Sequence, residues 1–223
     1  MEKIIRTGLI GFGISGQVFH APFLTTVAGY RLDTIVQRHD QTASRSYPGI
    51  SIRKSVEDVL NDPDIDLVVI TVPTSGHYDL ALNALQAKKH VVLEKPFTVT
   101  SEDALELIRV AREMGVLISP YHNRRYTGDF KTIRSIMEQG GLGRIVEFEG
   151  HYDRFRPQLR PGAWREQALP GSGILYDLGS HLIDQALLLF GSPKQITASL
   201  RIQRPGAGAT DYFDLRLDYA DLA

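Results

Sequence analysis

The chain has 223 residues, of which 43% are hydrophobic and 23% are charged, and it contains no cysteine. This composition is that of an ordinary globular protein, and the length corresponds to about 1.5 average domains. The 25 Lys and Arg residues nearly balance the 26 Asp and Glu residues, leaving a net charge of −1. We therefore expect neither a nucleic-acid partner nor a polybasic membrane tether.

Two further features narrow the class of protein. Without cysteine, the chain has no disulfides, thiolate metal sites or cysteine nucleophiles. No apolar run approaches the roughly 18 residues of a membrane span, and the apolar stretch at the amino terminus is too short for a secretory signal. We expect a cytoplasmic protein that has no membrane partner and requires no metal.

The first half of the chain has the pattern of a parallel α/β sheet. From residue 3 to about residue 123, short apolar runs alternate with helical patterns, as such a sheet requires. We expect strands at residues 4–10, 30–37, 50–53, 67–72, 90–93 and 117–121. We expect helices at residues 17–28, 56–61, 77–87 and 101–114.

The pattern changes after residue 123. We expect a helix at 129–139, a long strand at 144–152, an irregular stretch at 153–173, a nearly all-apolar helix at 177–190, and strands at 195–203 and 211–219. The last two strands follow each other without a helix, which indicates antiparallel pairing. The predicted fold class is an α/β Rossmann dinucleotide-binding domain at 1–123, followed at 124–223 by part of an α+β domain with an open, mostly antiparallel sheet.

The last predicted strand lies close to the end of the sequence. Hydrophobic and charged residues alternate cleanly over residues 213–219, and the sequence stops four residues later. A regular strand at a chain end usually has a neighbour. We expect that the sequence is part of a longer protein; a natural edge strand is the alternative.

A glycine-rich turn follows the first predicted strand. Its sequence is Gly11-Phe12-Gly13-Ile14-Ser15-Gly16, which fits the pattern G-x-G-x-x-G at the start of a helix. The first glycine permits a tight turn, the second lets a pyrophosphate approach the backbone, and the third lets the helix pack closely on the strand. The free N–H groups of the helix start then bind phosphate. The turn predicts dinucleotide binding; a purely structural turn is the alternative.

The end of the second predicted strand bears on the choice of dinucleotide. A site that prefers NAD carries a carboxylate there to bind the ribose hydroxyls. Gln37 and Arg38 occupy this position, whereas Asp33 lies too early in the strand. Arg38 can pair with a 2′-phosphate, so we expect NADP, with NAD as the alternative cofactor. A solvated charge at the strand end is the other interpretation of Arg38.

A charged pair lies at the carboxyl end of the fifth predicted strand. Glu94 and Lys95 come directly after buried apolar residues and are followed by Pro96. Ligands of open α/β sheets bind at these strand ends. A lysine there can donate to a substrate hydroxyl and stabilise negative charge as it develops on the oxygen. A turn with solvent-facing charges explains the same residues equally well.

The apolar helix predicted at 177–190 opens with polar residues. Asp177 and His181 are four residues apart, so they lie on one face of the helix, and Asp184 continues the same stripe. Buried carboxylate and imidazole groups must be paired or must face a cavity. Histidine also suits proton transfer near neutral pH. The alternative is a core histidine satisfied by Asp177, and Asp184 is expected to be structural, with a role in orienting His181.

With these motifs, the sequence resembles the Gfo/Idh/MocA family of NAD(P)-dependent sugar and polyol oxidoreductases. The resemblance covers essentially the whole chain and depends most on Glu94-Lys95-Pro96 and Asp177-x-x-x-His181. Three segments are similar to the branch that contains NADP-dependent scyllo-inositol dehydrogenases. They are Gly-Ile-Ser-Gly-Gln-Val-Phe-His-Ala-Pro at 13–22, Tyr121-His122-Asn123-Arg124-Arg125, and Trp164-Arg165.

The resemblance implies roles for particular residues. Lys95, Asp177 and His181 would be catalytic. Together with the glycine turn, Arg38 and Lys95, the implied cofactor-binding residues are Thr71, Pro73, His77, Glu94, Asn123, Trp164 and Arg165. Family members are usually longer, which puts in doubt whether this chain alone associates and turns over.

The implied reaction is reversible hydride transfer between a nicotinamide and a secondary alcohol of a small sugar or inositol-like polyol. His181 would be the general base, and Lys95 would hold the substrate oxygen. The full-length protein would be a homo-oligomer, either a dimer or a tetramer. Two alternatives use the same fold: a non-catalytic regulator that senses NADP, and a glycosidase that recycles NAD.

Overall fold

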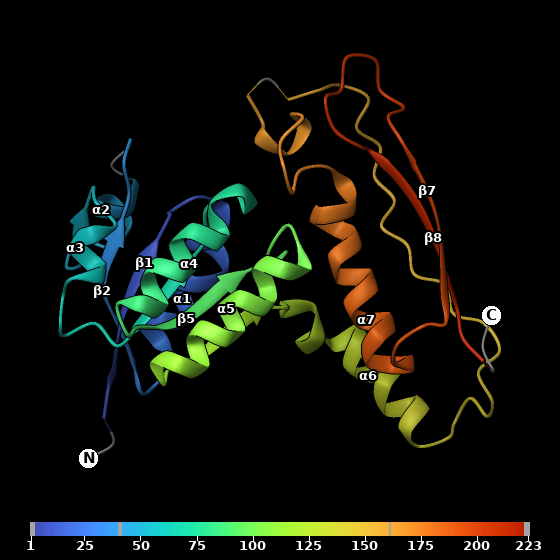
Figure 1. Ribbon diagram of the computed structural model, residues 1–223, viewed down its shortest axis with the longest axis horizontal. Coiled ribbons are helices and arrows are strands. Elements are labelled where there is room, and N and C mark those ends of the chain that lie inside the picture. The colour runs from blue at the N-terminus through green and yellow to red at the C-terminus, as the bar shows by residue number, and fades with distance from the viewer. Residues whose placement is uncertain (1–2, 40–41, 161, 221–223) are drawn as a thin grey trace. The chain divides into compact units, whose positions relative to one another are not determined.

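The structure, a computed structural model, describes residues 3–39, 42–160 and 162–220. The chain divides into two compact units, Met1–Tyr121 and His122–Ala223, and Figure 1 shows a parallel sheet with helices in the first and a long helix beside a β-ribbon in the second. None of the helices in the described ranges has the length and apolar character that crossing a membrane requires.

The first unit contains a six-stranded parallel sheet with the strand order β3-β2-β1-β4-β5-β6. This is the order of a Rossmann fold, which confirms the predicted fold class. The strands are β1 (Ile5–Ile10), β2 (Tyr30–Val36), β3 (Ser51–Arg53), β4 (Leu67–Ile70), β5 (His90–Glu94) and β6 (Ile118–Tyr121). The helices are α1 (Ala21–Thr26), α2 (Thr42–Ser46), α3 (Glu57–Leu60), α4 (His77–Gln86) and α5 (Ser101–Met114), with short turns η1 (Gly16–His20) and η2 (Thr74–Gly76).

The centre of this sheet is buried on both faces, which is why β4 is a continuous apolar run. Alternate residues of a strand point to opposite faces, and the neighbours Val68 and Val69 of β4 belong to two separate hydrophobic clusters. The cluster around Val68 includes residues of α3, α4 and α5, and the cluster around Val69 includes residues of α1 and α2. The sheet is therefore covered by helices on both sides, with its strand ends free to carry a site.

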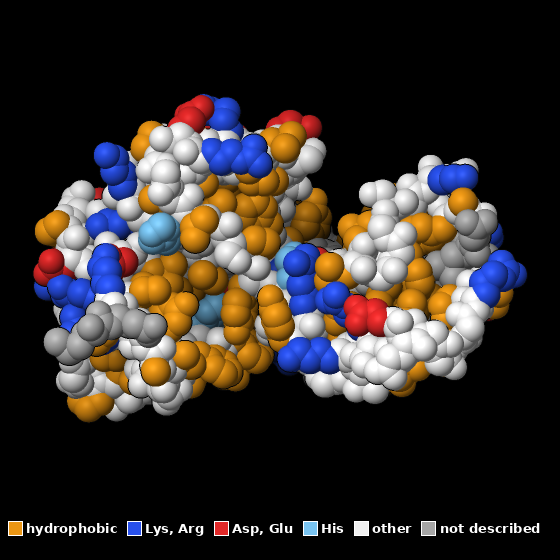
Figure 2. All heavy atoms as spheres, turned by 90° about the horizontal axis from the view of Figure 1, so that it is seen from below, with side chains coloured by type: hydrophobic (Ala, Val, Ile, Leu, Met, Phe, Trp, Pro, Cys, Tyr) orange, Lys and Arg blue, Asp and Glu red, His pale blue; other side chains and the backbone are white. Residues whose placement is uncertain are grey.

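Among the described residues of the second unit, two strands are paired. β7 (Gln195–Arg201) and β8 (Tyr212–Asp218) form an antiparallel ribbon, as predicted from the missing helix between them. Its other elements are η3 (Asn123–Tyr126), α6 (Gly128–Glu138), η4 (Trp164–Glu166), η5 (Leu175–Gly179) and α7 (Ser180–Phe190). Figure 2 shows hydrophobic side chains at the surface of the molecule. Phe155 and Ile196 are exposed hydrophobic residues of this unit.

Three predicted elements need correction. Residues 144–152 form no strand, because a strand requires a ladder partner and β7 and β8 pair only with each other here. The helix expected at 17–28 is split into the π-helical turn η1 and α1. The helix expected at 177–190 begins earlier, with the π-helical turn η5.

Candidate functional site

The glycine turn connects β1 to η1, and its glycines are required for different reasons. Gly11 has φ +94°, and a Cβ at Gly16 would lie 2.7 Å from the carbonyl oxygen of Gly11. A Cβ at Gly13 would meet nothing within 4 Å. Gly11 and Gly16 therefore let the turn fold closely, whereas Gly13 leaves open space beside the backbone. This open space fits the approach of a dinucleotide pyrophosphate.

Residues at the ends of β4 and β5 are joined to this turn. The Thr71 hydroxyl donates to the Gly11 carbonyl oxygen at 2.9 Å. The Ser15 hydroxyl donates a short hydrogen bond to Glu94 Oε1. Two of the residues predicted near the cofactor, Thr71 and Glu94, are thus bonded to the predicted phosphate turn. Pro73 is exposed at the start of η2.

Lys95 lies directly after β5, is half-buried, and is followed by a cis peptide bond to Pro96. The buried His77 at the start of α4 contacts two backbone carbonyl oxygens: its Nδ1 lies 2.8 Å from Pro96 O and its Nε2 lies 3.0 Å from Val72 O. Burial lowers the pKa of His77, and the carbonyl groups oppose this shift. His77 therefore ties the segment after Lys95 to the end of β4.

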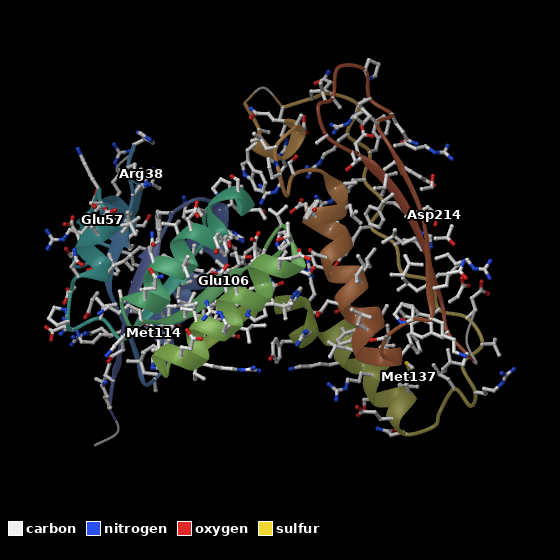
Figure 3. All side chains as sticks on the ribbon, viewed as in Figure 1. Arg38, Glu57, Glu106, Met114, Met137 and Asp214 are labelled. Carbon is white, nitrogen blue, oxygen red and sulfur yellow. The ribbon has the colours of Figure 1, made fainter. Side chains whose placement is uncertain are left out.

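Arg38 lies beyond the carboxyl end of β2 with an exposed side chain, and Figure 3 shows it near Glu57. The pKa of Glu57 is lowered, first by the hydrogen bond from Ser55 and to a smaller extent by the charge of Arg38. Asp33 pairs instead with Arg31 and Arg6. The described cation at the end of β2 is therefore Arg38, and Asp33 is engaged elsewhere in the sheet.

The second unit holds the remaining predicted residues. Arg165 Nε donates to Asp177 Oδ1 at 3.2 Å, and its guanidinium lies 4.5 Å from the centre of the Trp164 ring. These three residues line a cavity of about 420 Å³. His181 is only 6% exposed, and its ring lies 6.5 Å from that of Tyr152. Trp164, Arg165 and Asp177 are therefore brought together, with His181 one turn further along the helix.

Asp184 is held by a residue that the sequence did not indicate. It accepts two hydrogen bonds from the Arg125 guanidinium, at 2.8 Å and at a shorter distance. These bonds raise the pKa of Arg125, although burial opposes the shift. Asp184 therefore ties α7 to η3 through Arg125, and His122 Nδ1 lies 3.6 Å from its Oδ2.

Apart from its histidines, this unit has three buried polar side-chain atoms without a hydrogen-bond partner among the described residues. They are Oδ1 of Asn123, which is the first residue of η3, Oγ of Ser180, which begins α7, and the hydroxyl of Tyr219, which follows β8. Buried polar atoms are usually satisfied, so an unpartnered one calls for a bound water or ligand. Asn123 was among the residues expected near the cofactor, and its free acceptor fits that expectation.

Both π-helical turns of the described chain coincide with predicted sites. In η1, after the glycine turn, the N–H of Ala21 donates to Gly16 O, five residues back. In η5, which carries Asp177, the N–H of Ser180 donates to Leu175 O, again five residues back. Such turns are rare and often lie at functional sites. The two π-helical turns therefore precede α1 and α7, the helix that follows the glycine turn and the helix that carries His181.

His20 is a buried residue for which the sequence patterns predict no role. Its Nε2 lies 2.8 Å from Glu94 Oε1, and its ring centre lies 4.2 Å from that of Tyr121. The only sequence signal was a histidine on the apolar helix after the glycine turn. Its partner lies 74 residues away, and a distance of that kind cannot be derived from local spacing.

The comparisons with known proteins define the class to which the chain belongs. The model "Oxidoreductase family, NAD-binding Rossmann fold" matches residues 5–122, and the model "GFO/IDH/MocA C-terminal domain" matches residues 130–223. The chain belongs to the GFO/IDH/MocA family of oxidoreductases.

Particular relatives are similar over nearly all of this chain. The "Uncharacterized oxidoreductase YdgJ" of Escherichia coli is 46% identical and matches 98% of this chain and 63% of its own length. The "scyllo-inositol 2-dehydrogenase (NADP(+)) IolW" of Bacillus subtilis is 44% identical, with 98% and 61% covered. The solved structure of yvaA from Bacillus subtilis is 43% identical with a TM-score of 0.94, covering 100% of this chain and 63% of that one. The chain thus spans about three fifths of the length of these relatives.

Proposed function

We propose that the protein is an NAD(P)-dependent dehydrogenase that oxidises a secondary alcohol of a sugar or cyclic polyol, with NADP as the preferred cofactor. The observation that carries the proposal is the arrangement at the strand ends of the first unit. There the glycine turn, Thr71 and Glu94-Lys95 come from β1, β4 and β5 and are linked by hydrogen bonds. A dinucleotide turn and an amine at one edge of a Rossmann sheet suit hydride transfer next to a nicotinamide.

The roles of the residues follow from their chemistry. When bound, the nicotinamide supplies the acceptor for the hydride that leaves the carbinol carbon. The ammonium group of Lys95 donates to the substrate oxygen and stabilises its negative charge. A ring nitrogen of His181 accepts the hydroxyl proton. Asp177, which is held by Arg165, binds a neighbouring hydroxyl group.

The finer features of the proposal are supported by the relatives and by the sequence. IolW is named as an NADP-dependent scyllo-inositol dehydrogenase, and an inositol-like polyol is therefore the substrate class that we propose. We also propose a cytoplasmic location, a homo-oligomeric full-length protein, a first domain at 1–123 that binds the cofactor, and a second at 124–223 that binds the substrate and contributes to oligomerisation.

A spectrophotometric screen tests the proposal. NADP and NAD are offered with inositols, aldoses and their keto forms, and nicotinamide absorbance is followed. We expect His181→Ala to lower kcat about 10²–10⁴-fold and Lys95→Ala about 10²–10³-fold. His151→Ala and Lys194→Ala, both at exposed positions, are the matched controls. Turnover that survives both site substitutions undiminished would falsify the roles, and a cofactor that is recycled without net absorbance change would favour a glycosidase.

The cofactor preference has its own test at Arg38. Removal of one charge-assisted hydrogen bond to the 2′-phosphate lowers affinity roughly tenfold. We expect Arg38→Ala to weaken NADP binding by about that factor and to leave NAD binding unchanged, as measured by titration. Arg31→Ala, at the opposite end of β2, is the control. An NADP preference that persists in Arg38→Ala would place the selectivity at another residue.

A further inference from the structure

A buried carboxylate joins three segments of the first unit. Glu94 is 9% exposed at the end of β5. Its Oε1 accepts hydrogen bonds from the Ser15 hydroxyl and from His20 Nε2, and its Oε2 accepts from the backbone N–H of Lys95 at 3.1 Å. Burial raises the pKa of Glu94, but the bonds from His20 and Ser15 outweigh this and lower it below the ordinary value. The carboxylate is therefore ionised and has donors at both of its oxygens.

His20 is itself fixed from a second side. It is 4% exposed, and its ring packs against Tyr121 of β6. The Tyr121 hydroxyl donates to the carbonyl oxygen of Phe19 at 3.0 Å. The imidazole is thus held between the end of β6 and the carboxylate, where it has little freedom to turn away from Glu94.

Glu94 is bonded to two segments that the proposed reaction uses, the glycine turn and the residue that carries the amine. Ser15 lies between Gly13 and Gly16 of the glycine turn, and Lys95 follows Glu94 in the chain. One carboxylate therefore bonds both to the segment that fits the phosphates and to the backbone of the residue that carries the amine. Loss of any donor leaves a buried charge less well satisfied, which is costly in a site of low polarity.

We propose that Glu94 and His20 are positioning residues that hold the glycine turn and the Lys95 backbone as one unit. In this role Glu94 acts through Ser15 and Lys95, in contrast to the cofactor contact expected from the family pattern, and His20 acts through Glu94. The catalytic meaning of this pair rests on the proposed function.

Four substitutions separate this role from a general contribution to stability. His20→Phe removes the donor to Glu94 and keeps an aromatic ring against Tyr121. His20→Gln keeps an N–H donor of similar reach. Glu94→Gln keeps the shape and removes the charge, and it places an N–H group opposite one of the donors. His151→Asn, at an exposed histidine whose side chain is 65% accessible, is the matched control.

The first measurement is backbone hydrogen exchange of residues 11–17 and 94–97 in the protein without cofactor. We expect roughly tenfold faster exchange in His20→Phe and Glu94→Gln, and exchange close to wild type in His20→Gln and His151→Asn. Exchange that is unchanged in both His20→Phe and Glu94→Gln overturns the proposal. If His20→Phe does not fold, Glu94→Gln and the rescue by His20→Gln still decide it.

The second measurement is NADPH affinity together with kcat at saturating cofactor and substrate. We expect His20→Phe and Glu94→Gln to bind NADPH more weakly and also to lower kcat, because both the turn and the amine are displaced. A merely structural role lowers the melting temperature and leaves both constants of the folded protein unchanged, which contradicts the proposal. If the wild-type protein does not bind NADPH, the proposed function fails, and the exchange measurement alone decides whether the pair positions these segments.

Discussion

The two units of the molecule hold their polar groups in different ways. In Met1–Tyr121, Glu94, His20 and His77 are almost completely buried and are bonded to segments distant in the chain. In His122–Ala223, Arg165 and Asp177 meet at the wall of an open cavity, with about half of the Arg165 side chain exposed. The first unit therefore holds these groups within its core, whereas the pair that lines the cavity of the second unit lies nearer the surface.

The hydrophobic core is also more extensively buried in the first unit than in the second. Strands β1, β4 and β5 of the first unit are almost fully buried on both faces. Among the described hydrophobic side chains of the second unit, those that are buried are Phe130, Leu178 and Ala186. We infer that a perturbation of equal chemical size has the larger effect in the first unit. Two pairs of substitutions compare the units directly, and a third pair compares two ion pairs within the second unit.

The largest effect is expected in the core beside the site. Leu93 is 0% exposed and directly precedes Glu94, so Leu93→Ala should lower the free energy of unfolding by about 2–5 kcal/mol. Leu200→Ala on β7, where the side chain is 47% exposed, should change it by about 0.5 kcal/mol or less. Urea denaturation followed by circular dichroism measures both values. Fluorescence of Trp164, the single tryptophan, reports the second unit separately, and equal losses from the two substitutions would break the comparison.

A smaller effect is expected for the ion pair between Arg125 and Asp184 in the second unit. The side chain of Asp184 is 12% exposed and that of Arg125 is 39% exposed. Arg125→Ala should cost about 1–2 kcal/mol, because a largely buried carboxylate loses both hydrogen bonds from the guanidinium. The exposed pair of Arg134 and Glu138 on α6 provides the control, because Arg134→Ala should cost about 0.5 kcal/mol or less. Thermal unfolding measures the difference, and similar values for the two arginines would show that Asp184 finds another donor.

The smallest loss of stability is expected at the N-terminus of a helix, where two threonines can be compared. Thr100 caps α5 by accepting a hydrogen bond from the N–H of Asp103 at 3.2 Å, and Thr100→Ala should cost about 1 kcal/mol. Thr127, the N-cap residue of α6, makes no such bond to the helix, so Thr127→Ala should cost about 0.5 kcal/mol or less. Chemical denaturation of both variants is the test. A larger loss at Thr127 would mean that its hydrogen bond to Arg124 O matters more than the cap.

Most of the first unit could be predicted because its signals are local. The run of residues 67–70 is buried on both faces, as its continuous apolar character indicates. Ser101–Met114 was predicted with its observed bounds, since Thr100 and Gly115 are suitable residues for the two ends of a helix.

The predictions were wrong or incomplete where the structure depends on a proline ring or on a partner far away in the chain. Pro22 has no N–H to donate to the carbonyl four residues back, so a regular α-helix cannot continue through this position. In η1, just before it, the backbone hydrogen bond spans five residues instead of four. Residues 144–152 carry β-forming residues but lack a ladder partner. At the site, the residue types at 11–16, 95 and 177–181 were visible in the sequence. The pairing of Glu94 with His20 and of Asp184 with Arg125 joins segments too far apart for spacing to indicate.

The β7–β8 ribbon has a practical consequence for work with this chain. Each of its strands pairs on one side only within the described residues, and Ile196 and Leu200 of β7 are 62% and 47% exposed. Such an edge is a template onto which another polypeptide can add a strand. We expect the isolated chain to self-associate as its concentration rises, and a charged residue in place of Ile196 should keep it dispersed during purification.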